Sequence, residues 1–202
     1  SAAARSWLHV SCMLVSQIAR YAQLGKGLLK SICSAMANGI SRCISKSNAS
    51  SDLGVDDILL ALIVLAQHQK VYLTDEMIMC MFTDDNAELC LDVLIALEHM
   101  ESSAGADASP LFSAIMNGVV AGMTSEYKSE RSTTDVFVSG MDKSVLGELF
   151  CRIASSVAIQ EKVVSNATEK LLQAYASCAD TIDEGLSDVV AEVMRVVSQR
   201  YP

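Results

Sequence analysis

The feature that most constrains this chain is an unbroken run of nine apolar residues, Ile58 to Ala66, which Asp56 and Asp57 precede. A helix over this run is apolar on every side, so other parts of the protein must cover all of its faces. A bilayer span needs about 20 such residues, and the run is therefore too short to cross a membrane. We expect a buried central helix at about 55–69, with neighbouring segments packed around it.

Composition and spacing favour helices in the rest of the chain. Proline occurs only twice in 202 residues, at Pro110 and Pro202, so long stretches are free to be helical. The fold class that we predict is all-α: a compact bundle of about eight helices with no significant sheet. The expected helices span about 3–24, 28–44, 55–69, 86–100, 111–123, 142–159, 161–178 and 181–200, with a short one at 74–82.

The first expected helix has its large apolar side chains on one face. Trp7, Val10, Leu14, Ile18 and Tyr21 recur at intervals of three and four residues. Such an amphipathic pattern usually turns its apolar face toward the core of a globular protein.

Two descriptions of the domain organisation fit the sequence. A chain of 202 residues can bury a sizeable core, and we expect residues 1–202 to form a single helical domain. The best candidate for an internal boundary is the stretch 102–109, Ser-Ser-Ala-Gly-Ala-Asp-Ala-Ser, which Pro110 follows. A linker there would divide the chain into units 1–101 and 110–202.

Charge is distributed unevenly along the chain. Residues 1–51 have a net charge of +6, residues 52–107 of −11 and residues 108–202 of −4, which gives −9 in all. The acidic total argues against nucleic acid as a partner. The basic first quarter can neutralise the acidic second quarter within one subunit, or part of the contrast can lie on the surface and drive pairing between subunits. The partners that we predict are copies of this chain or other protein chains.

Seven cysteines show no zinc-type or redox spacing. Most have apolar neighbours, as in Met79-Cys80-Met81, which predicts buried thiols that act as small apolar side chains. Because the number is odd, at least one thiol stays unpaired or pairs with another chain. The cysteines are Cys12, Cys33, Cys43, Cys80, Cys90, Cys151 and Cys178.

No motif indicates a catalytic, cofactor or metal site, and we predict that the protein is not an enzyme. The three histidines, His9, His68 and His99, lie in expected helices, where the last two suit the dipole at a helix C-terminus. A catalytic Cys–His pair stays open as an alternative, because such partners meet in space and not in sequence. The acid pairs at 56–57 and 84–85 are expected at helix N-termini, without the spacing of a calcium loop.

Two further clusters bear on packing or on partner binding. The segment Met77 to Phe82 is rich in methionine, which predicts core filling or, alternatively, an adaptable surface for a partner. Ala114, Gly118 and Gly122 are small residues at a spacing of four, so their face would allow another helix to approach closely.

Three helical stretches carry a resemblance to a known family. They are Asn38-Gly-Ile-Ser-Arg-Cys-Ile-Ser45, Cys151-Arg-Ile-Ala-Ser-Ser-Val157 and Leu89-Cys-Leu-Asp-Val-Leu-Ile-Ala-Leu97. The first two resemble helical domains of spider silk proteins, and the third is similar to a cysteine-containing helix of their C-terminal domains. The resemblance implies an assembly module that dimerises.

The function that we predict is a non-enzymatic assembly or interaction module of a secreted fibrous or extracellular structural protein. The alternative is a helical scaffold or coat protein, intracellular or viral, with a cytoplasmic location. An enzyme comes third. The first residues, Ser-Ala-Ala-Ala-Arg, are not a signal peptide, so both locations stay open.

Overall fold

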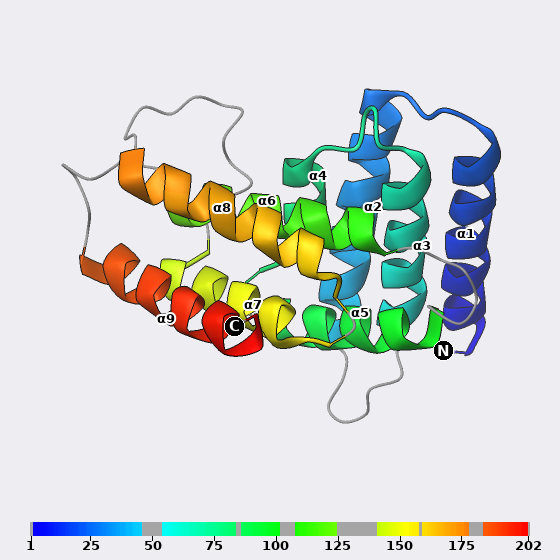
Figure 1. Cartoon of the computed structure of the whole chain (residues 1–202). Helices are drawn as coiled ribbons and strands as arrows, with labels where there is room; N and C mark the ends of the chain where they lie inside the picture. Colours follow the sequence, from blue (N-terminus) through cyan, green and yellow to red (C-terminus); the bar gives the residue numbers. More distant parts are fainter. Residues whose placement is uncertain are drawn as a thin grey trace, which may run out of the picture. The chain divides into compact units, whose positions relative to one another are not determined.

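The computed structural model describes residues 2–45, 54–83, 86–101, 108–124, 141–157, 159–177 and 184–201. Within these residues the protein has nine α-helices and no strand, which confirms the predicted all-α class (Figure 1). The helices are α1 (Ala2–Tyr21), α2 (Lys26–Ser45), α3 (Val55–His68), α4 (Asp75–Met79), α5 (Ala87–Glu101), α6 (Ser109–Thr124), α7 (Lys143–Ser155), α8 (Glu161–Ser177) and α9 (Glu184–Arg200).

The chain divides into two compact units, Ser1–Leu111 and Phe112–Pro202, which we call unit 1 and unit 2 and describe separately. The division falls inside α6, shortly after the boundary that the sequence suggests at 102–109. Residues 102–107 lie outside the described ranges.

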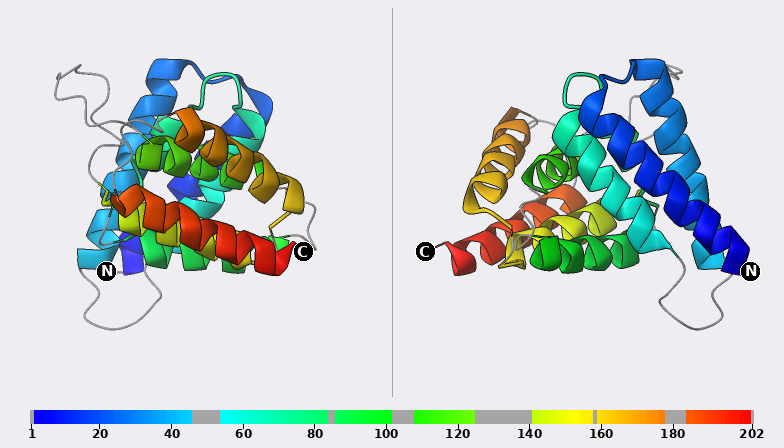
Figure 2. Two further views of the ribbon diagram at one scale, coloured as in Figure 1. Left: turned by 60° about the vertical axis from the view of Figure 1, so that its left-hand side comes forward. Right: turned by 90° about the vertical axis from the view of Figure 1, so that its right-hand side faces the viewer.

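The predicted central helix of unit 1 is confirmed. α3 packs against α1, α2 and α5 (Figures 1 and 2). The run from Ile58 to Ala66 is buried throughout except for Leu60, which is half-buried. The surrounding helices therefore remove nearly all of its apolar surface from water, as a helix without a polar face requires. Asp56 and Asp57 lie in its first turn, as expected.

Two glycines permit the close packing of α3 in unit 1. Gly54, the N-cap of α3, has φ 86°, in the left-handed region that favours glycine. A Cβ atom at this position would lie 2.7 Å from Cδ2 of Leu8 in α1. Gly39 of α2 makes room for Ile58, since a Cβ there would lie 3.0 Å from the Ile58 Cδ1 atom. Gly39 lowers the helix propensity of α2, but it allows α2 to approach α3.

The methionine-rich segment Met77 to Phe82 fills the core of unit 1. Cys80 is half-buried, and the other members of the segment are exposed by at most 7%. The short helix α4, which contains part of this segment, packs against α2. The prediction of core filling is confirmed, and the segment does not provide a partner surface.

Unit 2 is organised by α9, which packs against α7 and α8. Gly147 allows close packing of α7 and α9, because a Cβ there would lie 2.5 Å from Cγ1 of Val189. Near the end of α9, the guanidinium of Arg200 donates to the carbonyl oxygens of Ala154 and Ile159, the latter at 3.0 Å. Arg200 thereby satisfies a carbonyl in the last turn of α7, where helices lack internal donors.

Candidate interaction surface

In the described part of the chain, no group of three His, Cys, Asp or Glu side chains could hold a metal ion. The Nδ1 atom of His9 lies 2.8 Å from Oδ1 of Asp57 and so connects α1 with the first turn of α3. His68 is exposed at the end of α3. The side chain of His99 and the acids at 84–85 lie outside the described residues.

The six described cysteines form no disulfide with one another, and Cys178 lies outside the described residues. Cys33 and Cys90 are buried, as predicted, and Cys12 is buried too, whereas Cys80 and Cys151, which were also predicted to be buried, are half-buried. Burial raises the pKa of Cys33 and of Cys90 to about 12. Burial, with two neighbouring carboxylates, raises the pKa of Cys12 to about 11. Thiols with such pKa values stay protonated at neutral pH and are poor nucleophiles.

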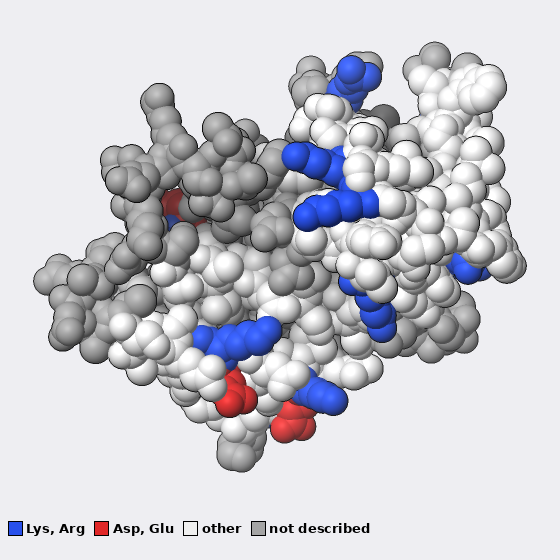
Figure 3. Space-filling view, turned by 90° about the horizontal axis from the view of Figure 1, so that it is seen from above, with Lys and Arg blue, Asp and Glu red and all other residues white. Residues whose placement is uncertain are grey.

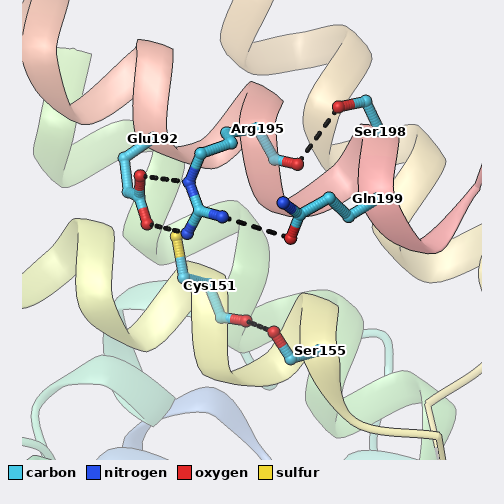
Figure 4. A network of polar contacts seen from close by, with 6 residues as sticks. All are labelled: Cys151, Ser155, Glu192, Arg195, Ser198 and Gln199. Atoms are coloured by element: carbon cyan, nitrogen blue, oxygen red, sulfur yellow. Dashed lines mark hydrogen bonds and ion pairs between the residues drawn. The ribbon is translucent and has the colours of Figure 1, made fainter.

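Cys151 of α7 lies beside a polar network of α9, shown in Figure 4. Arg195 donates two hydrogen bonds to the carboxylate of Glu192, at 2.8 and 2.5 Å, and one to Oε1 of Gln199, at 3.1 Å. The paired contact lowers the pKa of Glu192 and raises that of Arg195. Burial, and after it Glu192, raise the pKa of Cys151 to about 11, against the opposing effect of Arg195. The guanidinium therefore pairs with the carboxylate and does not activate the thiol.

A groove of about 500 Å³ lies between α8 and α9 of unit 2. Its polar side chains bond within α8. The hydroxyl of Thr168 donates to the carbonyl of Val164 at 2.8 Å. The amide of Gln173 donates to Glu169 at 3.1 Å. Small-molecule sites have polar groups that converge on the ligand, and these side chains are directed along their own helix instead.

The most unusual surface in the described residues is the outward face of α1. Trp7, Val10, Leu14, Ile18 and Tyr21 form a continuous row on this face, which we call the α1 stripe. Their exposed fractions are 73, 53, 60, 43 and 86%, respectively. Figures 1 and 2 show α1 at the edge of unit 1 with no helix of that unit over its outward side. The stripe is therefore an apolar surface of unit 1 that faces water, where large contiguous apolar patches usually mark an interaction site.

The opposite face of α1 carries smaller side chains and packs against α3. Cys12 and Ala19 are buried, and Leu8 and Val15 are half-buried. The sequence pattern of large apolar residues identifies the helix correctly, but the expectation that this face turns to the core is wrong. α1 has apolar residues on both sides, and on its inward side Leu8 lies close to Gly54 at the start of α3.

A buried glutamine fixes the end of α1 against α3. Gln69, the C-cap of α3, is only 1% exposed. Its Oε1 atom accepts hydrogen bonds from the backbone N–H of Leu24 at 2.8 Å and from the side chain of Gln23 at 3.2 Å. Its Nε2 atom donates to the carbonyl oxygens of Ala19 and Ala22, at 2.6 and 2.9 Å. These bonds hold α1 in the orientation that leaves the stripe outward.

The stripe itself contains no charged side chain. α1 contains Arg5 and Arg20 and no acid, and Lys26 and Lys30 follow in α2. Arg5 stands nine residues before Leu14, which is two and a half helical turns, so it lies on the side of α1 opposite to the stripe. In Figure 3, Lys and Arg side chains but no Asp or Glu side chains are visible at the upper right of the face among the described residues. A partner of the stripe therefore meets an apolar row.

None of the helices in the described ranges combines the length and the apolar character that a membrane crossing demands. No family model, no curated protein and no solved structure matches the chain. The class of protein is thus defined by the fold and the surface together: an all-α protein of two units, the first of which exposes an apolar helix face.

Proposed function

We propose that this chain is a non-enzymatic helical assembly module whose copies associate through the α1 stripe. The observation that carries the proposal is the exposure of five large apolar side chains in one row of a helix that is fixed on its other side. The resemblance of the three stretches to helical domains of spider silk proteins supports the same class of function.

The size of the stripe supports a stable contact between two copies. Because a large side chain offers on the order of 100 to 250 Å², the exposed parts of the stripe amount to roughly 600 Å² per copy. Two copies would then bury roughly 1,200 Å², the lower bound of stable protein interfaces. Trp7 and Tyr21, at the two ends of the stripe, belong to the residue types that contribute most to binding energy at interfaces.

A second copy is a better partner for this surface than a membrane. A helix that lies on a bilayer carries several Lys or Arg residues on its polar face. The face of α1 opposite to the stripe packs against α3 instead. The net charge of −9 also opposes attraction to anionic lipids.

The proposal includes an extracellular setting, which the resemblance to secreted silk domains supports. Free thiols do not conflict with that setting. Burial raises the pKa of Cys12, Cys33 and Cys90 to between about 11 and about 12, and so protects them from oxidation.

The experiment is sedimentation velocity over a range of protein concentrations, for the unmodified chain and for Leu14→Asp. Leu14 is 60% exposed, so the carboxylate is tolerated in the monomer. In the associated state it would be buried without a partner, and we expect association at least about 100-fold weaker, equivalent to ~3 kcal/mol.

The matched control is Val157→Asp, which places the same charge at an apolar residue of unit 2 that is 87% exposed. We expect it to associate like the unmodified chain. A chain that remains monomeric at every concentration, or a Leu14→Asp variant that associates normally, would contradict the proposal. Association with anionic lipid vesicles in place of self-association would contradict it as well.

A further inference from the structure

We infer that two copies associate with their α1 helices antiparallel, around a two-fold axis that passes through Leu14. The inference rests on the proposed function and specifies the geometry of the same surface. Its basis is the order of side chains in the α1 stripe, which is symmetric about Leu14 in both spacing and chemical type.

The symmetry extends over the whole stripe. Val10 and Ile18 stand four residues before and after Leu14, and both are β-branched. Trp7 and Tyr21 stand seven residues before and after it, and both are aromatic. The pattern aromatic, β-branched, Leu, β-branched, aromatic is therefore the same from either end.

The flanking polar positions follow the same symmetry. Ser11 and Gln17 stand three residues before and after Leu14, and both are polar and exposed. In an antiparallel pair each of them lies level with the other in the second copy. Ser11 and Gln17 lie on opposite sides of Leu14 around the helix, so Ser11 of both copies lines one edge of the contact and Gln17 of both copies lines the other. Both edges are therefore polar, as the rim of an interface requires.

Helix geometry turns this sequence symmetry into self-complementarity. At about 100° and 1.5 Å per residue, the five side chains lie within an arc of about 80° and over a length of about 21 Å. A two-fold axis through Leu14, perpendicular to the helix, brings Trp7 against Tyr21 of the second copy. It also brings Val10 against Ile18 of the second copy, and Leu14 against Leu14. Aromatic pairs of this kind gain stabilisation beyond the area that they bury.

The arrangement also determines the size of the assembly. Both copies use the same surface in an isologous contact, so the stripe is fully occupied after one pairing. The α1 contact therefore yields a closed dimer and not a filament.

Cross-linking between introduced cysteines tests the geometry. Val10→Cys and Ile18→Cys are prepared separately in the full chain, one of them with an added tag that makes a mixed dimer distinguishable by size. A short thiol-to-thiol cross-linker is applied to each variant alone and to their mixture, and the joined peptides are identified by mass spectrometry. The unmodified chain and Asp188→Cys, at an exposed residue of α9 in unit 2, measure the background from native thiols and random collision.

We expect at least about tenfold more linkage between positions 10 and 18 in the mixture than in either variant alone, since cross-links form only between neighbouring side chains. Linkage of Val10→Cys to itself, and of Ile18→Cys to itself, would establish a parallel pair and overturn the inference, while the proposed self-association would stand. A dimer in sedimentation without linkage in any sample would overturn the inference too. Monomeric behaviour of the unmodified chain would instead refute the proposed function.

Discussion

α1 and α3 lie side by side in unit 1, and both are rich in apolar residues, yet they use these residues in different ways. α3 is apolar all round, and its neighbours cover it. α1 packs its small residues, Cys12 and Ala19, toward α3 and leaves the α1 stripe in water. In α3 the apolar side chains stabilise the fold, whereas in α1 the large ones remain exposed to water. Apolar spacing along a helix therefore does not by itself decide which face packs inward.

The largest expected effect compares one apolar-to-acid change in each helix. Leu62 of α3 is 0% exposed, so Leu62→Asp buries an unpaired charge in the core. We expect a loss of roughly 5 kcal/mol or more, which is comparable to the whole stability of a domain. Circular dichroism during urea unfolding should show no cooperative transition in unit 1.

The counterpart is Leu14→Asp in the α1 stripe, which should change the free energy of unfolding of the monomer by at most about 0.5 kcal/mol. The contrast between the helices would be refuted by a cooperatively folded Leu62→Asp, or by a Leu14→Asp variant that unfolds. The second result would mean that the stripe is covered within one copy.

A smaller effect is expected at the connection between the two helices. Gln69→Ala removes four hydrogen bonds and leaves the N–H of Leu24 and the carbonyls of Ala19 and Ala22 without their partner. We expect a loss of about 3 kcal/mol, because buried polar groups without partners are costly. Urea unfolding measures it, and the matched control is Gln173→Ala, which removes a bond between exposed side chains of α8.

If Gln69→Ala is as stable as the control, the amide does not hold α1 in place. The stripe would then need another explanation for its outward position.

The part of the fold that could be predicted is the part that local patterns encode. The run Ile58 to Ala66 predicts a central helix, because a helix that is apolar on every side needs neighbouring segments to cover all of its faces. The methionine content of the segment Met77 to Phe82 predicted core filling, with a partner surface as the alternative, and the segment fills the core. Helix positions follow from apolar periodicity, which depends only on neighbours along the chain.

The orientation of α1 could not be predicted from its own sequence. It depends on Gln69, whose partners lie 45 to 50 residues away, and on the space that Gly54 leaves beside Leu8. Neither contact has a local signal. The presence of Cys12 and Ala19 opposite to the large apolar residues was the only indication that α1 has two faces able to pack.

A third prediction concerns pH and the inward face of α1. The pKa of Cys12 is raised from its ordinary value of 9.0 to about 11, chiefly by burial. Above pH 9 the unfolded thiol loses its proton while the folded one keeps it, so the unfolded state binds fewer protons and stability falls as pH rises. At about pH 10 this thiol should account for ~1 kcal/mol of the loss.

Cys12→Ala, measured by urea unfolding from neutral to alkaline pH, should therefore lose less stability than the unmodified chain over that range. The values of each protein at neutral pH serve as its own reference, since the substitution also removes some buried volume. Identical pH profiles would show that Cys12 ionises freely, and that the inward face of α1 is not packed like its neighbour α3.

The smallest expected effect is that of salt on self-association. If attraction between the basic first quarter of one subunit and the acidic second quarter of another held the two subunits together, salt would screen that attraction and weaken the contact. The α1 stripe contains no charged side chain, so salt has no attraction across it to screen, and the like net charge of the two copies leaves only repulsion to be reduced. Between about 0.1 M and about 1 M salt, where the screening length falls from ~10 to ~3 Å, we expect the dissociation constant to change by less than about threefold, in the direction of tighter association.

Sedimentation at both salt concentrations measures the dissociation constant, with a variant in which Lys26, Lys30 and Arg42 are changed to Gln as the matched comparison. A contact that weakens strongly with salt, and that weakens again in this variant, would place the charged surfaces and not the stripe between the subunits. A contact indifferent to both would mean that the charge contrast serves attraction inside one copy.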